Sequence, residues 1–316
     1  MNRLGLLLAV ALVVAVAPAL ALPAVAATTN AEAPSTAVSA DPAYDAFDAG
    51  DYPKAMELAK AAAERGEPEA HTLIGRMLAE GLGVPVDFKE AAKWFLKSAR
   101  LGDVEGDFAL GMLYARGQGV DKNLSKAADL FELASKRGHM LAEYNLALIL
   151  VAGEGRKQDV AAAAQLLEKA ATAGYNPARY DLGSLYRRGE GVRSSEREAA
   201  YWIGLAAEAG HREAQAEYAV MLFNGVGLTK DVKTAVWYFR AAAAKGSPIA
   251  QNRLARVYFF GAGADKDPVE GAKWHLLARA AGISDLELDV LMSQLSQADR
   301  QKAERAAAQV NSLLAP

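Results

Sequence analysis

Apolar and polar residues recur with helical spacing along most of the chain, in pairs of segments separated by short loops. The segment 70–80 carries apolar residues at three- and four-residue intervals, namely Ala70, Leu73, Ile74, Met77 and Leu78. After Asp87, a second apolar stripe consists of Ala91, Ala92, Trp94, Phe95, Ser98 and Ala99. Its opposite side is charged, with Glu90, Lys93, Lys97 and Arg100. The pattern predicts two amphipathic helices joined by a loop.

Glycines repeat this two-helix unit every 36 residues without an insertion or deletion. One series follows the first helix of each unit: Gly81, Gly117, Gly153, Gly189, Gly225 and Gly261. Each of these glycines has a partner two residues later, and another series closes each unit: Gly66, Gly102, Gly138, Gly174, Gly210, Gly246 and Gly282. Glycine adopts the left-handed backbone conformation that ends a helix, so these positions predict helix ends and turns.

A third series marks the predicted start of the second helix in each unit. It contains only residues whose side-chain oxygen can accept a hydrogen bond from a first-turn amide: Asp51, Asp87, Asn123, Asp159, Ser195, Asp231 and Asp267. The position of Ala91 stays small and that of Trp94 stays large in later units, which suits closely packed helices with a large side chain between them. One such hairpin buries too little surface to be stable alone, so we expect an all-α fold, an α-solenoid of stacked helix-turn-helix repeats.

The stretch ARYDLGSLYRRGEGV at 178–192 resembles Sel-1-like repeats, which are relatives of the tetratricopeptide repeats. Other units share its features, with Asp or Asn before the second helix and Lys-Ala-Ala runs before the closing glycine. The resemblance covers six full units at 70–285 and an N-terminal half-repeat at 41–69, and it implies a scaffold that binds other proteins. Some secreted relatives carry a disulfide in each repeat, whereas this chain has no cysteine and resembles the cysteine-free bacterial members.

The two ends of the chain depart from the repeat pattern. Residues 1–27 place Arg3 before an uncharged run with small-residue cleavage sites, which predicts a secretory signal peptide, with an uncleaved anchor as the alternative. Residues 28–40 are predicted to form a flexible linker. Residues 286–316 are predicted to form C-terminal capping helices, because a terminal repeat needs a polar outer face. Because residues 1–27 have the pattern of a signal peptide, we expect an exported protein located in the periplasm, with secretion as the alternative.

The amino-acid composition of the chain limits the kinds of binding partner that we expect. The chain has 35 Lys and Arg against 38 Asp and Glu, for a net charge of -3, and no strongly basic block, so a nucleic-acid partner is not expected. With 23% charged residues, it is not expected to insert into a membrane after signal cleavage. A protein or peptide partner is expected, and the oligomeric state is left open.

The sequence contains no arrangement that predicts catalysis. Motifs for a serine nucleophile, a zinc protease or a phosphate-binding loop are absent, and the absence of cysteine excludes thiol chemistry. The four histidines are scattered, and the Gly-x-Gly pairs follow helices and not strands. We expect neither catalytic residues, nor a cofactor, nor a metal site. Two alternatives to a binding scaffold stay open: a self-assembling structural protein of the cell envelope, and a hydrolase acting on cell wall or polysaccharide.

The side of each first helix that faces away from its second helix is expected to line a concave groove. In the unit 70–80 this side carries Thr72, Arg76 and Ala79, and we call these positions and their equivalents 36 residues apart the inner positions. Apolar residues and arginines at or beside them predict a partner-binding groove formed by Phe108, Met112, Tyr144, Leu148, Tyr180, Arg187, Arg188, Val220, Phe223 and Arg256. The alternative is that these side chains pack between adjacent first helices and complete the core.

Overall fold

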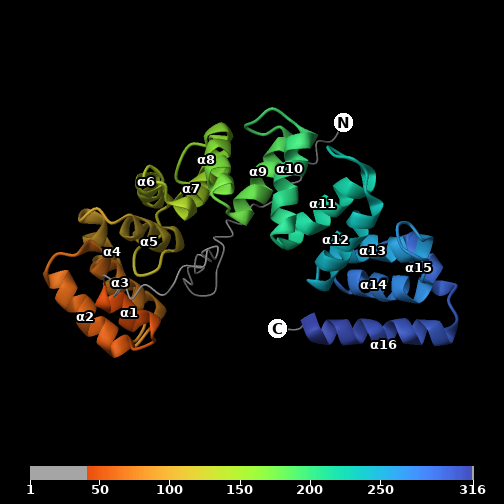
Figure 1. The fold of residues 1–316 in the computed structure, drawn as a ribbon, viewed down its shortest axis with the longest axis horizontal. Coiled ribbons are helices and arrows are strands. Elements are labelled where there is room, and N and C mark those ends of the chain that lie inside the picture. Colours follow the sequence, from red (N-terminus) through yellow and green to blue (C-terminus); the bar gives the residue numbers. More distant parts are fainter. Residues whose placement is uncertain (1–40, 315–316) are drawn as a thin grey trace, which may run out of the picture. The chain divides into compact units, whose positions relative to one another are not determined.

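The computed structural model describes residues 41–314, which form sixteen helices and no strand (Figure 1). The predicted signal peptide and linker lie outside the described residues. The helices belong to two compact units, an N-terminal unit that ends at Leu166 and a C-terminal unit that begins at Leu167, and we describe each unit by itself.

The N-terminal unit contains three complete hairpins and the helical residues that follow them up to Leu166. Its helices are α1 Pro42–Asp48, α2 Tyr52–Glu64, α3 Pro68–Glu80, α4 Phe88–Arg100, α5 Val104–Arg116, α6 Leu124–Ser135, α7 Met140–Ala152 and the first half of α8 Val160–Thr172. The C-terminal unit continues with α9 Asn176–Arg188, α10 Glu196–Glu208, α11 Arg212–Asn224, α12 Val232–Ala244, α13 Pro248–Phe260, α14 Pro268–Ala280, α15 Leu286–Ser293 and α16 Gln297–Leu314.

Within each unit, a helix packs mainly against the helices that precede and follow it in the chain. The odd-numbered helices from α3 to α13 are the first helices of the repeats, and the even-numbered helices from α2 to α14 are the second helices. This chain of nearest-neighbour contacts confirms the predicted all-α solenoid of helix-turn-helix repeats.

Helix starts and ends lie where the repeated polar and glycine residues predict them. In all seven second helices, the predicted capping oxygen accepts the amide of the residue three positions later, at 2.9 to 3.3 Å. The first helices from α3 to α13 all end at the predicted glycine, with φ between 68° and 76°. These two local devices set the length of each helix.

The second glycine of a Gly-x-Gly pair has a function besides the turn that the sequence predicts. A Cβ atom on Gly119 would lie 2.2 Å from the carbonyl carbon of Phe88, and one on Gly227 would lie 2.0 Å from the carbonyl oxygen of Glu196. In both cases the contacted residue begins the second helix of the preceding repeat. The loop glycines therefore allow close backbone contact between neighbouring repeats as well as a turn.

In the second helices from α4 to α12, the largest fully buried side chain lies one residue after the predicted large position. Phe95, Phe131, Leu167, Ile203 and Phe239 are at most 2% exposed, whereas Trp94 is only half-buried. The reason is visible at Gly75 of the first helix, where a Cβ atom would lie 2.6 Å from the Phe95 ring. The ring fills the space that the glycine leaves, and Trp94 lies beside it with the Lys97 ammonium 4.4 Å from its ring centre.

The last repeat is covered by a helix with a polar outer side, as predicted for a C-terminal cap. Helix α16 packs against α14, with Ala303 and Ala307 buried. Its exposed residues include Arg300, Lys302, Glu304 and Arg305. Among the described helices, none combines the length and the apolar character needed to cross a membrane.

Candidate functional site

In the N-terminal unit, the predicted groove residues are largely part of the core. Phe108 is 3% exposed, and Met112 and Tyr144 are each 9% exposed, while Leu148 is half-buried. The Phe108 ring stacks on His139 at 4.4 Å between ring centres. The exposure that we expected for Phe108, Met112 and Tyr144 is therefore not found, because neighbouring first helices lie close enough for these side chains to fill the space between them.

Inner positions also connect each repeat to the next. The residue equivalent to Thr72 contacts the residue that precedes or caps the next first helix: Thr72 donates to Asp103 at 2.5 Å, and Phe108 stacks on His139. In the C-terminal unit, Tyr180 stacks in the same way on His211, with 4.9 Å between ring centres. These contacts are a structural function of the inner positions that the repeat pattern alone does not reveal.

The two arginines near Tyr180 have partners within the protein. Tyr180 donates a hydrogen bond to Glu217 Oε2 at 3.2 Å, and Arg187 Nη1 lies 2.5 Å from Glu217 Oε1. Arg188 pairs with Glu190 at 2.9 Å on the surface. Burial raises the pKa of Tyr180 to about 12 and also raises the pKa of Glu217, although Arg187 opposes the latter shift. This part of the predicted groove is an internal polar cluster with an exposed edge.

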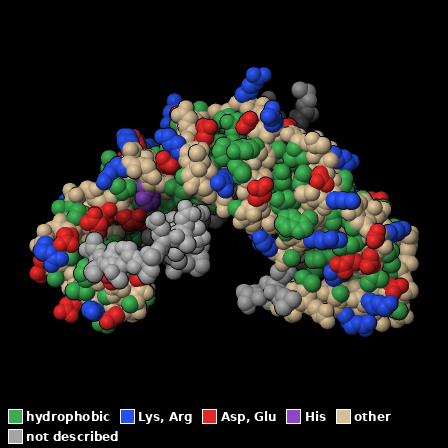
Figure 2. All heavy atoms as spheres, in the orientation of Figure 1, with side chains coloured by type: hydrophobic (Ala, Val, Ile, Leu, Met, Phe, Trp, Pro, Cys, Tyr) green, Lys and Arg blue, Asp and Glu red, His purple; other side chains and the backbone are tan. Residues whose placement is uncertain are grey.

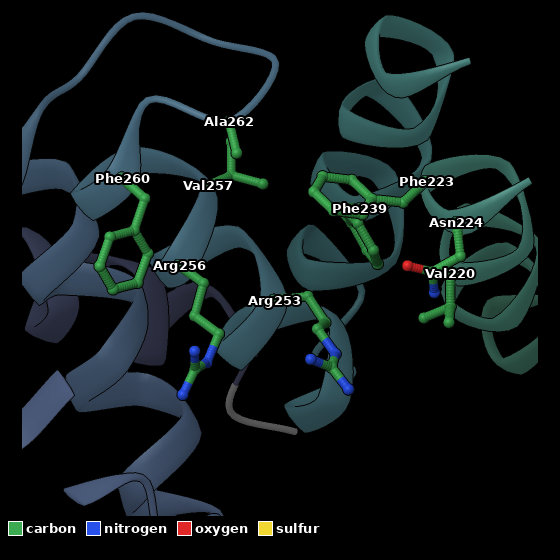
Figure 3. A pocket seen from close by; sticks show the side chains of 9 residues that line it. All are labelled: Val220, Phe223, Asn224, Phe239, Arg253, Arg256, Val257, Phe260 and Ala262. Atoms are coloured by element: carbon green, nitrogen blue, oxygen red, sulfur yellow. The ribbon is translucent and has the colours of Figure 1, made fainter. Parts of the chain in front are cut away.

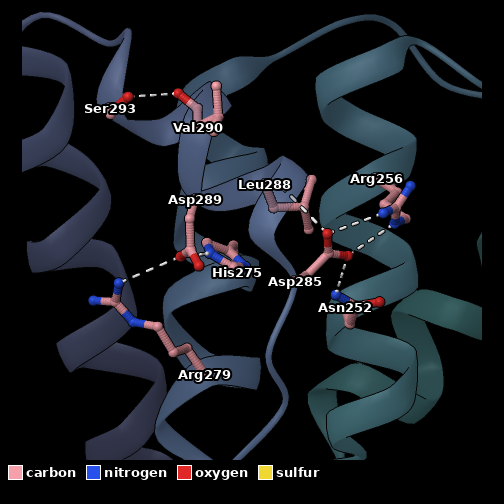
Figure 4. Close-up of polar contacts among 9 residues, drawn as sticks. All are labelled: Asn252, Arg256, His275, Arg279, Asp285, Leu288, Asp289, Val290 and Ser293. Atoms are coloured by element: carbon pink, nitrogen blue, oxygen red, sulfur yellow. Dashed lines mark hydrogen bonds and ion pairs between the residues drawn. The ribbon is translucent and has the colours of Figure 1, made fainter.

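Arg256 holds the C-terminal helices in place. It makes two 2.9 Å hydrogen bonds to the Asp285 carboxylate, and Asn252 donates to the same aspartate at 2.9 Å (Figure 4). Arg256 also forms a 2.9 Å ion pair with Glu287. Asp285 also caps α15 through the Leu288 amide. Although burial opposes the shift, hydrogen bonds from Arg256 and Asn252 hold the pKa of Asp285 below its usual value.

A pocket of about 270 Å³ lies between α11 and α13 in the C-terminal unit. Figure 3 shows its walls, which consist of Val220, Phe223 and Asn224 from α11, Phe239 from α12, Arg253, Arg256, Val257 and Phe260 from α13, and Ala262 from the loop that follows. Three of these residues, Val220, Phe223 and Arg256, belong to the groove predicted from the sequence. Arg253 and Phe260, which lie one turn to either side of Arg256 on α13, were not predicted.

The pocket combines apolar walls with positive charge. Its lining contains two arginines and no acidic residue. The guanidinium of Arg256 is occupied by Asp285 and Glu287, whereas Arg253 is exposed and makes no ion pair or hydrogen bond with the described residues. Phe260 is 49% exposed. The space-filling view likewise shows apolar side chains exposed among charged ones over the C-terminal unit (Figure 2).

The histidines occupy separate structural positions. His139 and His211 cap α7 and α11. Their Nδ1 atoms accept hydrogen bonds from the amides of Ala142 and Ala214, at 3.1 and 3.3 Å. His275 is 1% exposed and lies 2.8 Å from Asp289 Oδ1. Within residues 41–314, no group of three or more His, Asp or Glu side chains is arranged to hold a metal ion.

Comparison with solved structures shows which proteins share this fold. The crystal structure of c5321, a protective antigen of uropathogenic Escherichia coli strains with an SLR fold, aligns with a TM-score of 0.74 and 27% identity over 83% of this chain. The alignment spans only 59% of that protein. A Sel1 repeat protein from Oxalobacter formigenes aligns with a TM-score of 0.66 and 29% identity, over 77% of this chain and 97% of the other. A comparison with curated proteins found no match.

The repeats also match a family model. The Sel1 repeat model matches seven segments, at residues 48–67, 68–103, 104–139, 141–175, 176–211, 212–247 and 248–283. Proteins with Sel1 repeats generally mediate protein–protein interactions and are typically non-catalytic scaffolds. Since the matched segments cover most of the chain, this protein belongs to the Sel1 repeat family.

Proposed function

We propose that this protein is an exported, non-enzymatic scaffold that binds a peptide or protein partner at the pocket between α11 and α13. Export is inferred from the charge and hydrophobic pattern of residues 1–27, and the periplasm is the expected location. The scaffold is expected to act in envelope signalling or in the assembly of an envelope complex.

The observation that carries this proposal is the apolar pocket itself. Val220 and Phe223 are partly buried and Phe260 is half-exposed, so these side chains are not fully used by the core. Aromatic side chains beside arginine are enriched at the centres of protein interfaces, where they supply much of the binding energy. A partner that covered the pocket would remove this apolar surface from water.

An affinity capture from the envelope fraction tests the scaffold function. The tagged protein is compared with a Phe223→Ser, Phe260→Ser variant, and a Tyr201→Ser variant serves as the control, because Tyr201 is 56% exposed and does not line the pocket. We expect the wild type and the Tyr201→Ser control to capture a partner that the Phe223→Ser, Phe260→Ser variant does not capture. A partner retained equally by all three proteins, with circular dichroism unchanged, would contradict a binding function for the pocket.

Export has its own test. Cell fractionation, followed by N-terminal sequencing of the recovered protein, should place it in the periplasmic fraction with a new N-terminus near residue 27. Recovery of the intact chain from the cytoplasm would contradict the proposed location without affecting the binding test.

A further inference from the structure

The size of the pocket between α11 and α13 limits what it can enclose. Its volume of about 270 Å³ is below the roughly 300–1,000 Å³ of pockets that bury drug-sized ligands. Phe223, Phe239 and Val257 supply apolar walls, so a single large apolar side chain suits the space better than a polar cofactor. A peptide can insert one such side chain while its backbone stays outside.

The charge at the edge of the pocket specifies what should lie next to that side chain. Arg253 and Arg256 both extend along the same edge (Figure 3). Arg256 already has two carboxylates, Asp285 and Glu287, within 2.9 Å. Arg253 has no partner among the described residues, and the pocket lining contains no carboxylate that could supply one.

We propose that the pocket recognises a peptide in which a large apolar side chain is adjacent to a carboxylate, with the side chain inserted among Phe223, Phe239 and Phe260 and the carboxylate paired with Arg253. The inference rests on the proposed scaffold function and names the chemistry of its partner. The planar guanidinium of arginine can donate two parallel hydrogen bonds to one carboxylate. An Asp or Glu side chain and a free C-terminal carboxylate share this chemistry.

A phosphopeptide fits the pocket less well. Phosphate recognition in proteins commonly uses a cluster of arginines, because the group carries up to two negative charges. Here the second arginine of the pocket is neutralised by two carboxylates, which leaves the single guanidinium of Arg253. One free guanidinium matches the single charge of a carboxylate.

The test uses short fluorescent peptides with a Gly-Ser background and the purified full-length protein. One peptide carries Phe next to Glu, a second replaces Glu by Gln, a third replaces Phe by Ala, and a fourth is phosphorylated on Ser next to Phe. Two further peptides end in Phe with a free or an amidated C-terminus, which separates a side-chain carboxylate from a terminal one. Affinities are measured by fluorescence anisotropy.

We expect the Phe-Glu peptide, or the peptide with a free terminal carboxylate, to bind about tenfold more tightly than its uncharged counterpart, as a charge-assisted hydrogen bond predicts. Arg253→Gln should abolish this preference and leave the weaker affinity for the uncharged peptide unchanged. Phe260→Ala should weaken both peptides. Arg197→Gln is the matched control, because Arg197 is also exposed, has no partner among the described residues and does not line the pocket.

Three results would overturn the inference: a carboxylate preference that survives Arg253→Gln, stronger binding of the phosphopeptide, or no binding of any peptide. None of these results by itself contradicts the proposed scaffold function. If the capture experiment still shows a partner that depends on Phe223 and Phe260, the scaffold function stands and only the carboxylate chemistry is wrong.

Discussion

The inner positions of the two units have the same repeat register but different exposure. In the N-terminal unit, Phe108 fills the space between α5 and α7 and stacks on His139. Between α11 and α13 of the C-terminal unit, the equivalent residues are the small Ala216 and Ser247, which are buried and form no aromatic pair. The pocket lies one to two turns further along α11, where Val220 and Phe223 line it. The comparison shows that one inner position of a Sel1 repeat can either lie in the core, as Met112 does, or line a pocket, as its equivalent Val220 does.

The largest effect on the free energy of unfolding should follow from removing the Phe108 ring, which fills the space between α5 and α7. Phe108→Ala is expected to lower the free energy of unfolding by about 3–5 kcal/mol, because it leaves a cavity beside His139 and Phe131. Phe260→Ala, at the pocket between α11 and α13, should change the free energy of unfolding by less than about 1 kcal/mol, since Phe260 is 49% exposed. Urea unfolding followed by circular dichroism measures both. Equal effects would show that the two units do not differ in this way.

The two pocket arginines should differ in their effect on stability. Arg256→Gln is expected to cost about 1–2 kcal/mol, because Arg256 binds Asp285 and is only partly exposed, so solvent screens the pair incompletely. The pKa of Asp285 is lowered in the folded state, so the stability it contributes is present above its unfolded pKa and is lost as the pH falls through the folded value. Unfolding curves of wild type and variant should therefore converge in acid. A constant difference would contradict this origin.

A buried carboxylate in the N-terminal unit has a neutral counterpart in the C-terminal unit. Gln215 and Gln251 donate hydrogen bonds to the carbonyls of Ala207 and Ala243, at the end of the preceding second helix. Asp107 occupies the same position at 8% exposure and, when ionised, has no proton to donate. Asp107→Gln is expected to stabilise the protein by about 1 kcal/mol at pH 7.

The pH dependence gives a second measurement on the same variant. Burial raises the pKa of Asp107, so its favourable contribution to stability is complete below the unfolded pKa and is lost as the pH rises through the folded value. The advantage of Asp107→Gln should therefore grow from acidic to neutral pH. Asp45→Asn, on the exposed side of α1, is the control, and a variant as stable as wild type at every pH would contradict the assignment.

The smallest effect is expected at the pocket arginine without a partner. Arg253→Gln should change the free energy of unfolding by less than about 0.5 kcal/mol, because no ion pair or hydrogen bond with the described residues is lost. The thermal unfolding midpoint of this variant should match that of Arg197→Gln. A clear loss of stability would show that Arg253 supports the fold, and it would weaken the case for a ligand at that position.

Much of the fold could be predicted because the decisive interactions are local. Asp87 accepts an amide three residues away, and Gly81 ends α3 through its own backbone conformation. The same devices return every 36 residues, so the helix bounds, the repeat number and the solenoid were accessible from the chain alone. The site was accessible only in part: Val220, Phe223 and Arg256 were named from their register, whereas Arg253 and Phe260 were not.

The sequence by itself therefore determined the repeat unit, its helices and the all-α solenoid, because capping, glycine conformation and apolar periodicity act within one or two helical turns. Only the tertiary structure decided that Phe108 and Tyr144 are buried while Phe260 is exposed, and that Arg256 is paired while Arg253 is not. The exposure of a side chain depends on the size and distance of residues in the next repeat. Asp285, which occupies Arg256, lies 29 residues further along the chain and reaches it only through the packing of the C-terminal helices.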